Sequence, residues 1–255
     1  MITYTIYGRN ISLRDRIPLV KFCDILTEQG DGSLRFLVEM DNDQEELWQL
    51  RSQPQKFSFL NRTAPRSLQQ SILDSKLTRL KDKRILGLTF AYALIQCYGI
   101  SCLKGALQKE SVFFYNLAEN YPDFGRPFVS AQFSGHAQVP DQPNMSIQHR
   151  NPAILALGIL LLEIHTGLLL ESFLTPTEAS NPSPNIKLIT ARRIVEGLDD
   201  CSENYKDAIR ACLEVPWVPA GEKVDLGDAE TGSGFYDHVI RKLEEELEFL
   251  FRVQI

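Results

Sequence analysis

Few residues of this sequence stand in a pattern that could carry out chemistry. The most suggestive is Asp123, in Asp123-Phe124-Gly125, because an aspartate oxygen is a ligand that Mg²⁺ accepts. Glu163 and His165 form a second ionisable pair, at the end of a long apolar run. Serine, histidine and aspartate occur elsewhere, but no Gly-x-Ser-x-Gly motif and no paired metal-ligand spacing organises them. Spacing alone therefore predicts no hydrolase site and no metal centre, and we expect no bound cofactor.

Composition sets the broad class of the protein. The chain has 255 residues, of which 44% are hydrophobic and 24% charged, as in an ordinary globular protein. Its net charge of −6 argues against a nucleic-acid partner, because general nucleic-acid binders usually have a basic excess. The odd number of cysteines, without a Cys-x-x-Cys pair, favours reduced thiols over disulfides or a zinc site. The segment from Met1 to Tyr7 lacks the pattern of a signal peptide, so we expect a soluble, cytoplasmic protein.

One segment, from Asn151 to Gly167, is predicted to organise the rest of the chain. From Ala153 to Leu162 it has no polar side chain, which is typical of a membrane span or of the buried axis of a globular domain. A bilayer needs roughly 20 apolar residues, so this shorter run predicts no membrane span. Asn151 is a suitable helix cap, Pro152 suits the first turn and Gly167 suits the exit. We expect a central helix packed on all sides, with a structural hub at Leu157, Gly158, Leu161 and Glu163.

The first 66 residues are predicted to form a small domain of short strands and one helix. The periodicity places strands at 2–6, 34–40 and 47–50, with a turn at 41–43 and the last strand returning antiparallel. Pro18 is expected to open a helix that ends near Gly30. Residues 51–66 are expected to be a linker or crossover.

From residue 67 onwards the sequence is mainly helical. Besides the central helix, helices are predicted at 67–73, 80–98, 186–197, 205–213 and from 235 onwards. The stripe that the 80–98 helix buries is expected to be Ile85, Leu88, Tyr92 and Ile95. The remaining segments are predicted to be strands at 112–115 and 127–133, loops at 134–150 and 214–234, and an exposed excursion at 175–185. The fold class is therefore α+β, mainly α, with domains at 1–66 and 67–255.

The central segment reads Leu-x-Leu-Gly-x-Leu-Leu-x-Glu-Ile-x-Thr-Gly over residues 155–167. This pattern resembles the central helix of the protein-kinase large lobe, and the order of the neighbouring elements is similar as well. Residues 104–113 fall where kinases carry His-Arg-Asp-Leu-Lys-x-x-Asn. Ala106 stands at the catalytic aspartate and Ser111 at the metal-binding asparagine. The resemblance implies a protein-kinase-like large lobe without catalytic residues, that is, a pseudokinase.

The parts that would bind and transfer a phosphoryl group are missing from this pattern. Alanine offers no proton acceptor and serine is a poor magnesium ligand, whereas phosphoryl transfer depends on carboxylate-held magnesium. No Gly-x-Gly-x-x-Gly loop, Val-Ala-Ile-Lys lysine or Ala-Pro-Glu motif can be placed, nor the arginine that pairs with the last of these. The segment ahead of residue 80 is too short for a full nucleotide-clamping lobe, so a reduced N-terminal lobe is expected.

The whole chain resembles a poorly characterised fungal family of degenerate kinase-like domains. The matching segments are 18–23, 47–50, 80–103, 151–167 and 205–213. Members often follow an N-terminal helical domain of the HeLo type, associated with fungal cell death and prion propagation. The resemblance implies a regulatory, non-catalytic domain whose partner is a protein, such as a HeLo-type domain in cis or in trans. The chain would then be either an independent module or a fragment whose partner domain is missing.

Asp123-Phe124-Gly125 is literally the Asp-Phe-Gly motif of kinases, at about the expected distance after Ala106. Such a motif should end a buried strand, whereas residues 118–122 are predicted to contain no strand and place a proline against the motif. The better strand follows the motif, so we expect a coincidence. The alternative is a divergent ATP-binding phosphotransferase that uses Asp123.

The other polar residues singled out are expected to be structural. Glu163 is predicted to be a satisfied structural carboxylate, although the matching glutamate of kinases can engage a substrate or a loop. His149-Arg150-Asn151 is expected to cap and charge the entrance of the central helix. Trp48 and Trp217 are expected to be partly buried, and partners to bind at the loops after Gly99 and Phe133. Two charged groups are expected to be solvated: the basic cluster Lys76, Arg79, Lys81, Lys83 and Arg84, and the run Glu244-Glu245-Glu246.

Overall fold

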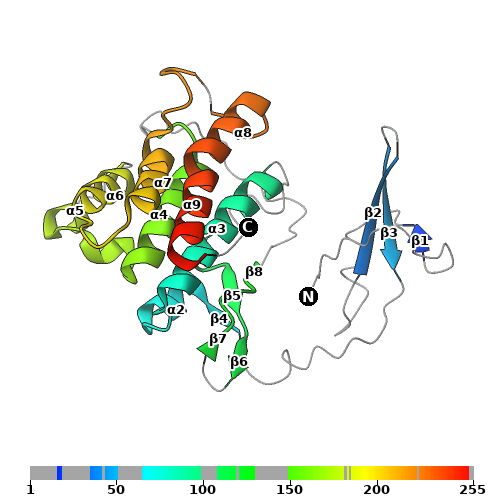
Figure 1. Ribbon diagram of the computed structural model, residues 1–255, viewed down its shortest axis with the longest axis horizontal. Coiled ribbons are helices and arrows are strands. Elements are labelled where there is room, and N and C mark those ends of the chain that lie inside the picture. Colours follow the sequence, from blue (N-terminus) through cyan, green and yellow to red (C-terminus); the bar gives the residue numbers. More distant parts are fainter. Residues whose placement is uncertain are drawn as a thin grey trace. The chain divides into compact units, whose positions relative to one another are not determined.

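The computed structural model divides the chain into two compact units, Met1–Asn61 and Arg62–Ile255 (Figure 1). In the first unit it describes the backbone of three strands, and in the second it describes residues 65–98, 108–118, 121–129, 149–180, 183, 185–222 and 224–252. The predicted strand at 2–6, the body of the helix predicted after Pro18, and the loops after Gly99 and Phe133 lie outside the described residues. Each unit is described by itself.

The first unit contains a three-stranded antiparallel sheet in the order β1-β3-β2, built from β1 (Arg16–Pro18), β2 (Arg35–Asp41) and β3 (Gln44–Leu50). Asp41 pairs with Gln44, so only two residues connect β2 to β3. This confirms the predicted antiparallel pairing. Pro18 itself, however, ends a strand opposite Trp48. Its fixed φ fits the end of a short edge strand as well as a first helical turn.

The second unit is a bundle of helices, and the fold is α+β and mainly helical, as predicted. The helices α3, α4, α7 and α9 lie side by side (Figure 1). Among the residues described, no helix is long and apolar enough to cross a membrane. The helical elements are α2 (Leu68–Leu73), α3 (Leu80–Cys97), α4 (Pro152–Thr166), η3 (Leu170–Phe173), α5 (Pro176–Ser180), α6 (Ile186–Glu196), α7 (Glu203–Glu214), α8 (Ala229–Phe235), η4 (Tyr236–Ile240) and α9 (Arg241–Phe251).

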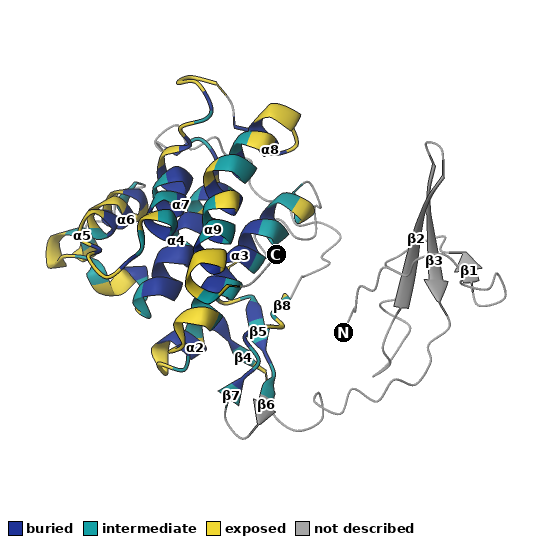
Figure 2. Cartoon of the chain, in the orientation of Figure 1, coloured by how far each residue is buried: buried dark blue, intermediate teal, exposed yellow. Residues whose placement is uncertain are grey.

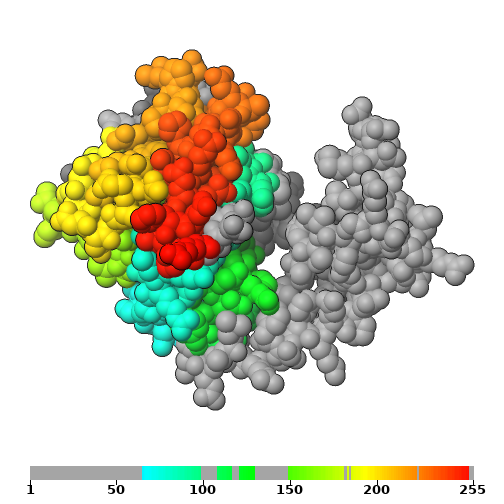
Figure 3. Space-filling model, in the orientation of Figure 1, coloured from blue at the N-terminus to red at the C-terminus, as the bar shows by residue number. Residues whose placement is uncertain are grey.

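Three helical segments were not predicted: η3, α5 and α8. Helix α8 begins inside the predicted loop at 214–234, where the Asp228 side chain accepts from Thr231 N and caps it. It continues through η4, a π-helical turn, into α9, whose side chains run across the face drawn in Figure 3. The short helix α5 lies in the predicted excursion at 175–185 and buries none of its residues. The glycines of α8 and the prolines around α5 favoured a loop prediction, because those residues have the weakest helix propensities.

Short strands accompany the bundle. β4 (Arg66–Ser67), β5 (Val112–Phe114) and β8 (Phe128–Val129) form an antiparallel sheet in the order β4-β5-β8. A separate two-stranded ladder joins β6 (Asn116–Ala118) to β7 (Tyr121–Pro122). The prediction that residues 118–122 contain no strand is therefore wrong, and this ladder leads directly into Asp123.

Helix α4 has the ends that its sequence predicts. The Asn151 side chain accepts hydrogen bonds from Ala153 N at 3.0 Å and Ile154 N at 3.1 Å, and Pro152 occupies the first turn. At the exit Gly167 adopts the left-handed conformation, with φ of 70°, which glycine adopts without steric cost. The cap, the first-turn proline and the exit glycine are thus confirmed.

Burial along α4 is uneven. Residues 160–165 are buried without interruption, and Leu157 and Gly158 are buried one turn earlier. Ala156 is exposed, and Ala153, Leu155 and Ile159 are only half-buried. Figure 2 shows the buried residues along α4 and on the inner sides of α3 and α7. The prediction of a helix packed on all sides therefore holds for its C-terminal half, while its N-terminal half has one exposed side.

The stripe predicted for α3 is also only partly right. Leu88 is buried, but Ile85, Tyr92 and Ile95 are half-buried at the edge of the core. The helix packs against both α4 and α9, so the surface that it buries is wider than one stripe and is centred elsewhere. Its buried residues are Arg84, Leu86, Gly87, Leu88, Phe90, Ala91 and Leu94.

Two charged residues predicted to be solvated lie inside the bundle. Arg84 donates from Nε to Glu246 Oε1 at 2.8 Å, and both side chains are buried. The guanidinium also lies 3.8 Å from the centroid of the Tyr205 ring and donates to His165 Nδ1 at 3.2 Å. The predictions for the basic cluster and the glutamate run are therefore wrong at Arg84 and at Glu246, whereas Arg79 and Lys81 are exposed as predicted. Removing one partner of such a pair would leave the other charge buried without compensation. The pair therefore links α3 to α9 strongly.

We expect Gly158→Ala to lower the free energy of unfolding. A Cβ at Gly158 would lie 2.8 Å from Cys212 Cβ and 3.2 Å from Leu213 Cδ2, so α4 and α7 would have to separate. Overpacking of this kind costs about 1–3 kcal/mol, which exceeds the gain of up to about 1 kcal/mol from alanine's helix propensity. Urea unfolding monitored by circular dichroism measures the difference.

The matched control is Gly232→Ala in α8. A Cβ there would meet Leu226 O at 3.4 Å and Ile95 Cδ1 at 4.0 Å, which are ordinary contacts. Its stability should be unchanged or raised. Equal effects of the two substitutions would show that the close approach of α4 and α7 does not govern stability.

We also expect stability to fall as the pH drops below neutrality, because two buried histidines are held neutral. Burial lowers the pKa of His149 and of His165 from the ordinary value of 6.5. Each ring also accepts a hydrogen bond at Nδ1, from Asn151 N and from Arg84 Nη1 respectively, and a proton there would break it.

The sign follows from linkage. Both folded-state pKa values lie below the unfolded value, so the unfolded state binds more protons as the pH falls through about 6.5. Stability is then complete above that pH and declines below it, by at most about 1.4 kcal/mol per pH unit for each histidine. Urea unfolding from pH 8 to 5 measures the slope. His149→Gln keeps a donor for Cys212 O and should reduce the slope, and an unchanged slope would contradict this assignment.

Candidate functional site

The segment that precedes β5 is attached to the bundle by its backbone. Gln108 O accepts from Ser111 N at 2.9 Å and from Val112 N at 3.2 Å, forming a tight turn, and Lys109 O accepts from Gln69 N of α2 at 3.0 Å. Ser111 lies half-buried in this turn. Ala106 lies outside the described residues. The backbone thus fixes where the Lys109 side chain starts.

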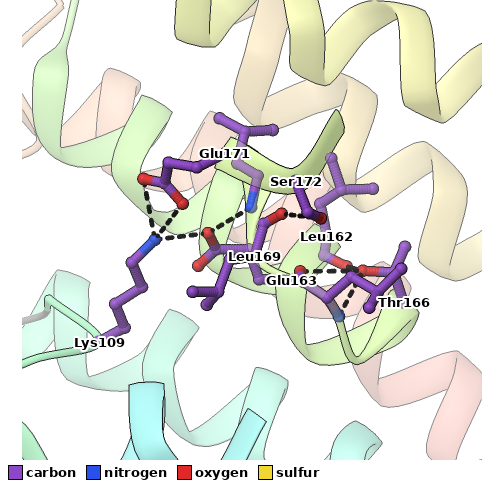
Figure 4. Close-up of polar contacts among 9 residues, drawn as sticks. Lys109, Leu162, Glu163, Thr166, Leu169, Glu171 and Ser172 are labelled. Atoms are coloured by element: carbon purple, nitrogen blue, oxygen red, sulfur yellow. Dashed lines mark hydrogen bonds and ion pairs between the residues drawn. The ribbon is translucent and has the colours of Figure 1, made fainter. Parts of the chain in front are cut away.

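Lys109 joins this turn to the central helix (Figure 4). Its Nζ lies 2.7 Å from Glu163 Oε1, on α4, and 2.9 and 3.1 Å from the two carboxylate oxygens of Glu171, on η3. Glu163 Oε1 also accepts from Leu170 N at 2.8 Å. One ammonium therefore connects three segments, and we call Lys109, Glu163 and Glu171 the lysine node.

Neighbouring hydrogen bonds hold the two acidic elements in place (Figure 4). Thr166 Oγ1 donates to Leu162 O at 2.9 Å in the last turn of α4. Ser172 Oγ donates to Leu169 O at 2.7 Å within η3. These bonds are local to the last turn of α4 and to η3. The backbone that carries the two carboxylates is therefore held in place independently of Lys109.

The electrostatics of the lysine node follow from unequal burial. The Lys109 side chain is 12% exposed and that of Glu163 only 2%, whereas Glu171 is 52% exposed. Burial by itself would lower the pKa of Lys109, but the hydrogen bonds and charges of Glu163 and Glu171 outweigh it and raise that pKa. Burial raises the pKa of Glu163. The ammonium is therefore firmly charged, and its charge offsets the cost of keeping a carboxylate in the core.

Asp123 has the setting that the sequence did not predict. It follows β7 directly, and its backbone N donates to Tyr115 O at 2.8 Å. Phe124 is buried, with its ring 5.0 Å from that of Phe114 and 5.9 Å from that of Tyr121, measured between centroids. A two-residue strand therefore precedes this motif, contrary to the prediction, and it contains the proline that stands against the motif. Apart from Tyr121, residues 118–122 have weak strand propensity, and the Tyr121 ring packs near that of Phe124.

The Asp123 carboxylate is accessible but already has local partners. It is 20% exposed, accepts from Gly125 N at 3.2 Å, and lies 3.8 Å from Arg126 Nε. Within the described part of the chain, no group of three or more histidine, cysteine, aspartate or glutamate side chains could hold a metal ion. Asp123 could therefore bind a cation only together with ligands from elsewhere, such as the phosphates of a nucleotide.

The segment His149-Arg150-Asn151 does more than cap α4. Asn151 is the cap, as predicted, but His149 Nε2 lies 2.8 Å from Cys212 O, at the end of α7. Arg150 donates to carbonyl oxygens at and beyond that end, those of Glu214, Val215, Val218 and Pro219. These contacts tie the entrance of α4 to the segment that follows α7. Cations are favourable there because unpaired carbonyls gather at a helix C-terminus.

Lys109 was not predicted as a site residue. No local pattern marks it, since its partners lie in α4 and η3. The one available signal was Glu163, because a carboxylate at the end of an apolar run has to find a cation if it is buried. Of the tryptophans, Trp217 is half-buried and stacks on His238 at 5.5 Å between centroids, while the side chain of Trp48 lies outside the described residues.

We expect Lys109→Met to destabilise the protein by about 2–4 kcal/mol, because Glu163 would remain buried without its cation. The loss should be smaller at pH 5 than at pH 8, since the unpaired carboxyl can take up a proton. The double variant Lys109→Met/Glu163→Gln should recover much of the loss. Chemical denaturation of the four proteins in this double-mutant cycle measures the coupling.

Glu171→Gln serves as the control for this cycle. Its carboxylate is half exposed, so its pair with Lys109 should contribute less than about 1 kcal/mol. If Lys109→Met costs no more than Glu171→Gln, then the buried half of the lysine node does not stabilise the fold.

Comparison with known proteins places the chain in a family. A family model described as "Domain of unknown function (DUF7580)" matches residues 14–249. The comparison with curated proteins gives no match. The matched segment includes the lysine node, Asp123 and the whole of α4. Because the model covers most of the chain, this protein belongs to the DUF7580 family of domains of unknown function.

Proposed function

We propose that this protein is a catalytically inactive kinase-like domain that acts as a protein-interaction or regulatory module. The supporting arrangement begins with α3, which is followed by the turn at 108–111, β5, and the ladder of β6 and β7. Asp123-Phe124-Gly125, the hub helix α4, and α6, α7 and α9 come next. This is the order expected of a kinase-type large lobe. The observation that carries the proposal is the lysine node, which attaches the turn containing Ser111 to α4 by an ion pair.

The chemistry of that turn favours an inactive domain. Ala106 supplies no proton acceptor and Ser111 is a poor magnesium ligand. The ammonium of Lys109 is engaged by two carboxylates and is therefore not free to neutralise a transferring phosphoryl group. Phosphoryl transfer needs positioned charge at the reacting atoms, and these residues provide none.

An inactive domain with an intact hub suits recognition of another protein. The family resemblance suggests a HeLo-type helical domain as the partner and fungal cell-death or incompatibility signalling as the setting. In this proposal the protein-kinase-like helical domain binds the partner protein, and the first unit corresponds to a reduced N-terminal lobe.

A second candidate function is a divergent ATP-binding phosphotransferase that uses Asp123. The observation in its favour is the strand β7 immediately before Asp123, together with the buried ring of Phe124. That setting would hold the carboxylate at a constant position, which a magnesium ligand requires. The absence of an acid at position 106 weighs against it.

Thermal unfolding in the presence of ATP and Mg²⁺ separates the two candidates. A ligand at about 100 times its Kd stabilises the folded state by about 2.7 kcal/mol, which is readily seen as a rise in Tm. The inactive module should show no rise. A rise that disappears in Asp123→Ala and persists in the exposed control Asp199→Ala would replace the proposal with the phosphotransferase.

A further inference from the structure

A small hollow lies where the entrance of α4 meets α6 and the end of α7. Its volume is about 260 Å³, below the roughly 300–1,000 Å³ of pockets that hold small molecules. A nucleotide is therefore too large for it, whereas one side chain or one compact anion is not. The lining residues are His149, Arg150, Leu188, Arg192, Leu213, Glu214 and Val215.

The two arginines of this hollow differ in how many of their hydrogen-bond donors are already used. Arg150 is held by four backbone carbonyls, so its charge has a fixed position. Arg192, on α6, is exposed and makes one long hydrogen bond, 3.5 Å to Leu213 O, and no ion pair with any residue that the structure describes. Its guanidinium has five N–H donors, so most of them remain free for a ligand.

The balance of charge in the hollow favours an anion. Two guanidiniums face one carboxylate, that of Glu214, and the carbonyl end of α7 is already covered by Arg150. Burial is the largest cause of the lowered pKa of His149, and the positive charges of Arg192 and Arg150 lower that pKa as well. The fields of both guanidiniums therefore reach the His149 ring. This local excess stands out in a chain whose net charge is −6.

We propose that this hollow binds an acidic side chain of a protein partner, whose carboxylate or phosphoryl oxygens pair with Arg192 while Arg150 supplies a fixed second charge. Guanidinium groups pair with planar carboxylates and with phosphates in a forked geometry, which gives direction as well as charge. The proposal deepens the interaction role and rests on it.

Fluorescence anisotropy with labelled peptides tests the proposal. The full chain is titrated against a glutamate-rich peptide, a phosphoserine peptide of the same length, and a glutamine-substituted peptide as the neutral control. We expect at least one anionic peptide to bind, the neutral one to bind at least about tenfold more weakly, and the affinity to fall as salt rises.

Two variants of α6 assign the binding to the hollow. Arg192→Glu should weaken anionic-peptide binding at least about tenfold, whereas Lys187→Glu should leave it within about twofold. Lys187 is exposed on the same helix, lies outside the hollow, and undergoes the same change of charge. Both positions are on the surface, and circular dichroism with thermal unfolding checks that each variant is folded.

Several outcomes would overturn the proposal. Equal losses in the two variants would mean a diffuse electrostatic effect, and equal binding of the neutral peptide would exclude charge recognition. Binding of inorganic phosphate through Arg192 without binding of either anionic peptide would assign the hollow to a free anion. None of these results depends on the ATP titration, so failure here is distinguishable from failure of the proposed function.

Discussion

A carboxylate buried in an apolar helix is stable only if a positive charge is brought to it, and this constraint governs the centre of the molecule. Glu163 lies in the C-terminal half of α4, where every neighbouring position is buried. Lys109 supplies the charge from the turn ahead of β5, and Glu171 on η3 shares it. The cost of burying one acid thereby couples three segments of the bundle.

The same principle operates at other points of the bundle. Arg84 crosses from α3 to Glu246 on α9 and contacts His165 near the exit of α4. At the entrance of α4, Arg150 gathers the carbonyls that end α7. Both ends of the central helix are thus held by long cationic side chains whose partners are distant in the chain. Apolar packing along α4 gives the bundle its core, and these charges fix how its segments are oriented.

This arrangement bears on the proposed function through what the turn at 108–111 is used for. In the proposed inactive module the turn is a structural connection to α4, and its cation is engaged inside the protein. Asp123 keeps a setting in which a carboxylate could act, because β7 and the buried Phe124 hold it in place. In the same proposal, the residues that would use such a setting for phosphoryl transfer are absent from positions 106 and 111.

The sequence by itself determined the mainly helical α+β class, the ends of α4, the hairpin of β2 and β3, and most helix positions, because caps and hydrophobic periodicity act over a few neighbouring residues. It did not determine which charged residues lie inside. Lys109, Arg84 and Glu246 look solvated when only their neighbours in the chain are considered, and β7 has no strand signal. The tertiary structure decided these points, because burial and ion pairing depend on segments far apart in the sequence that only the folded bundle brings together.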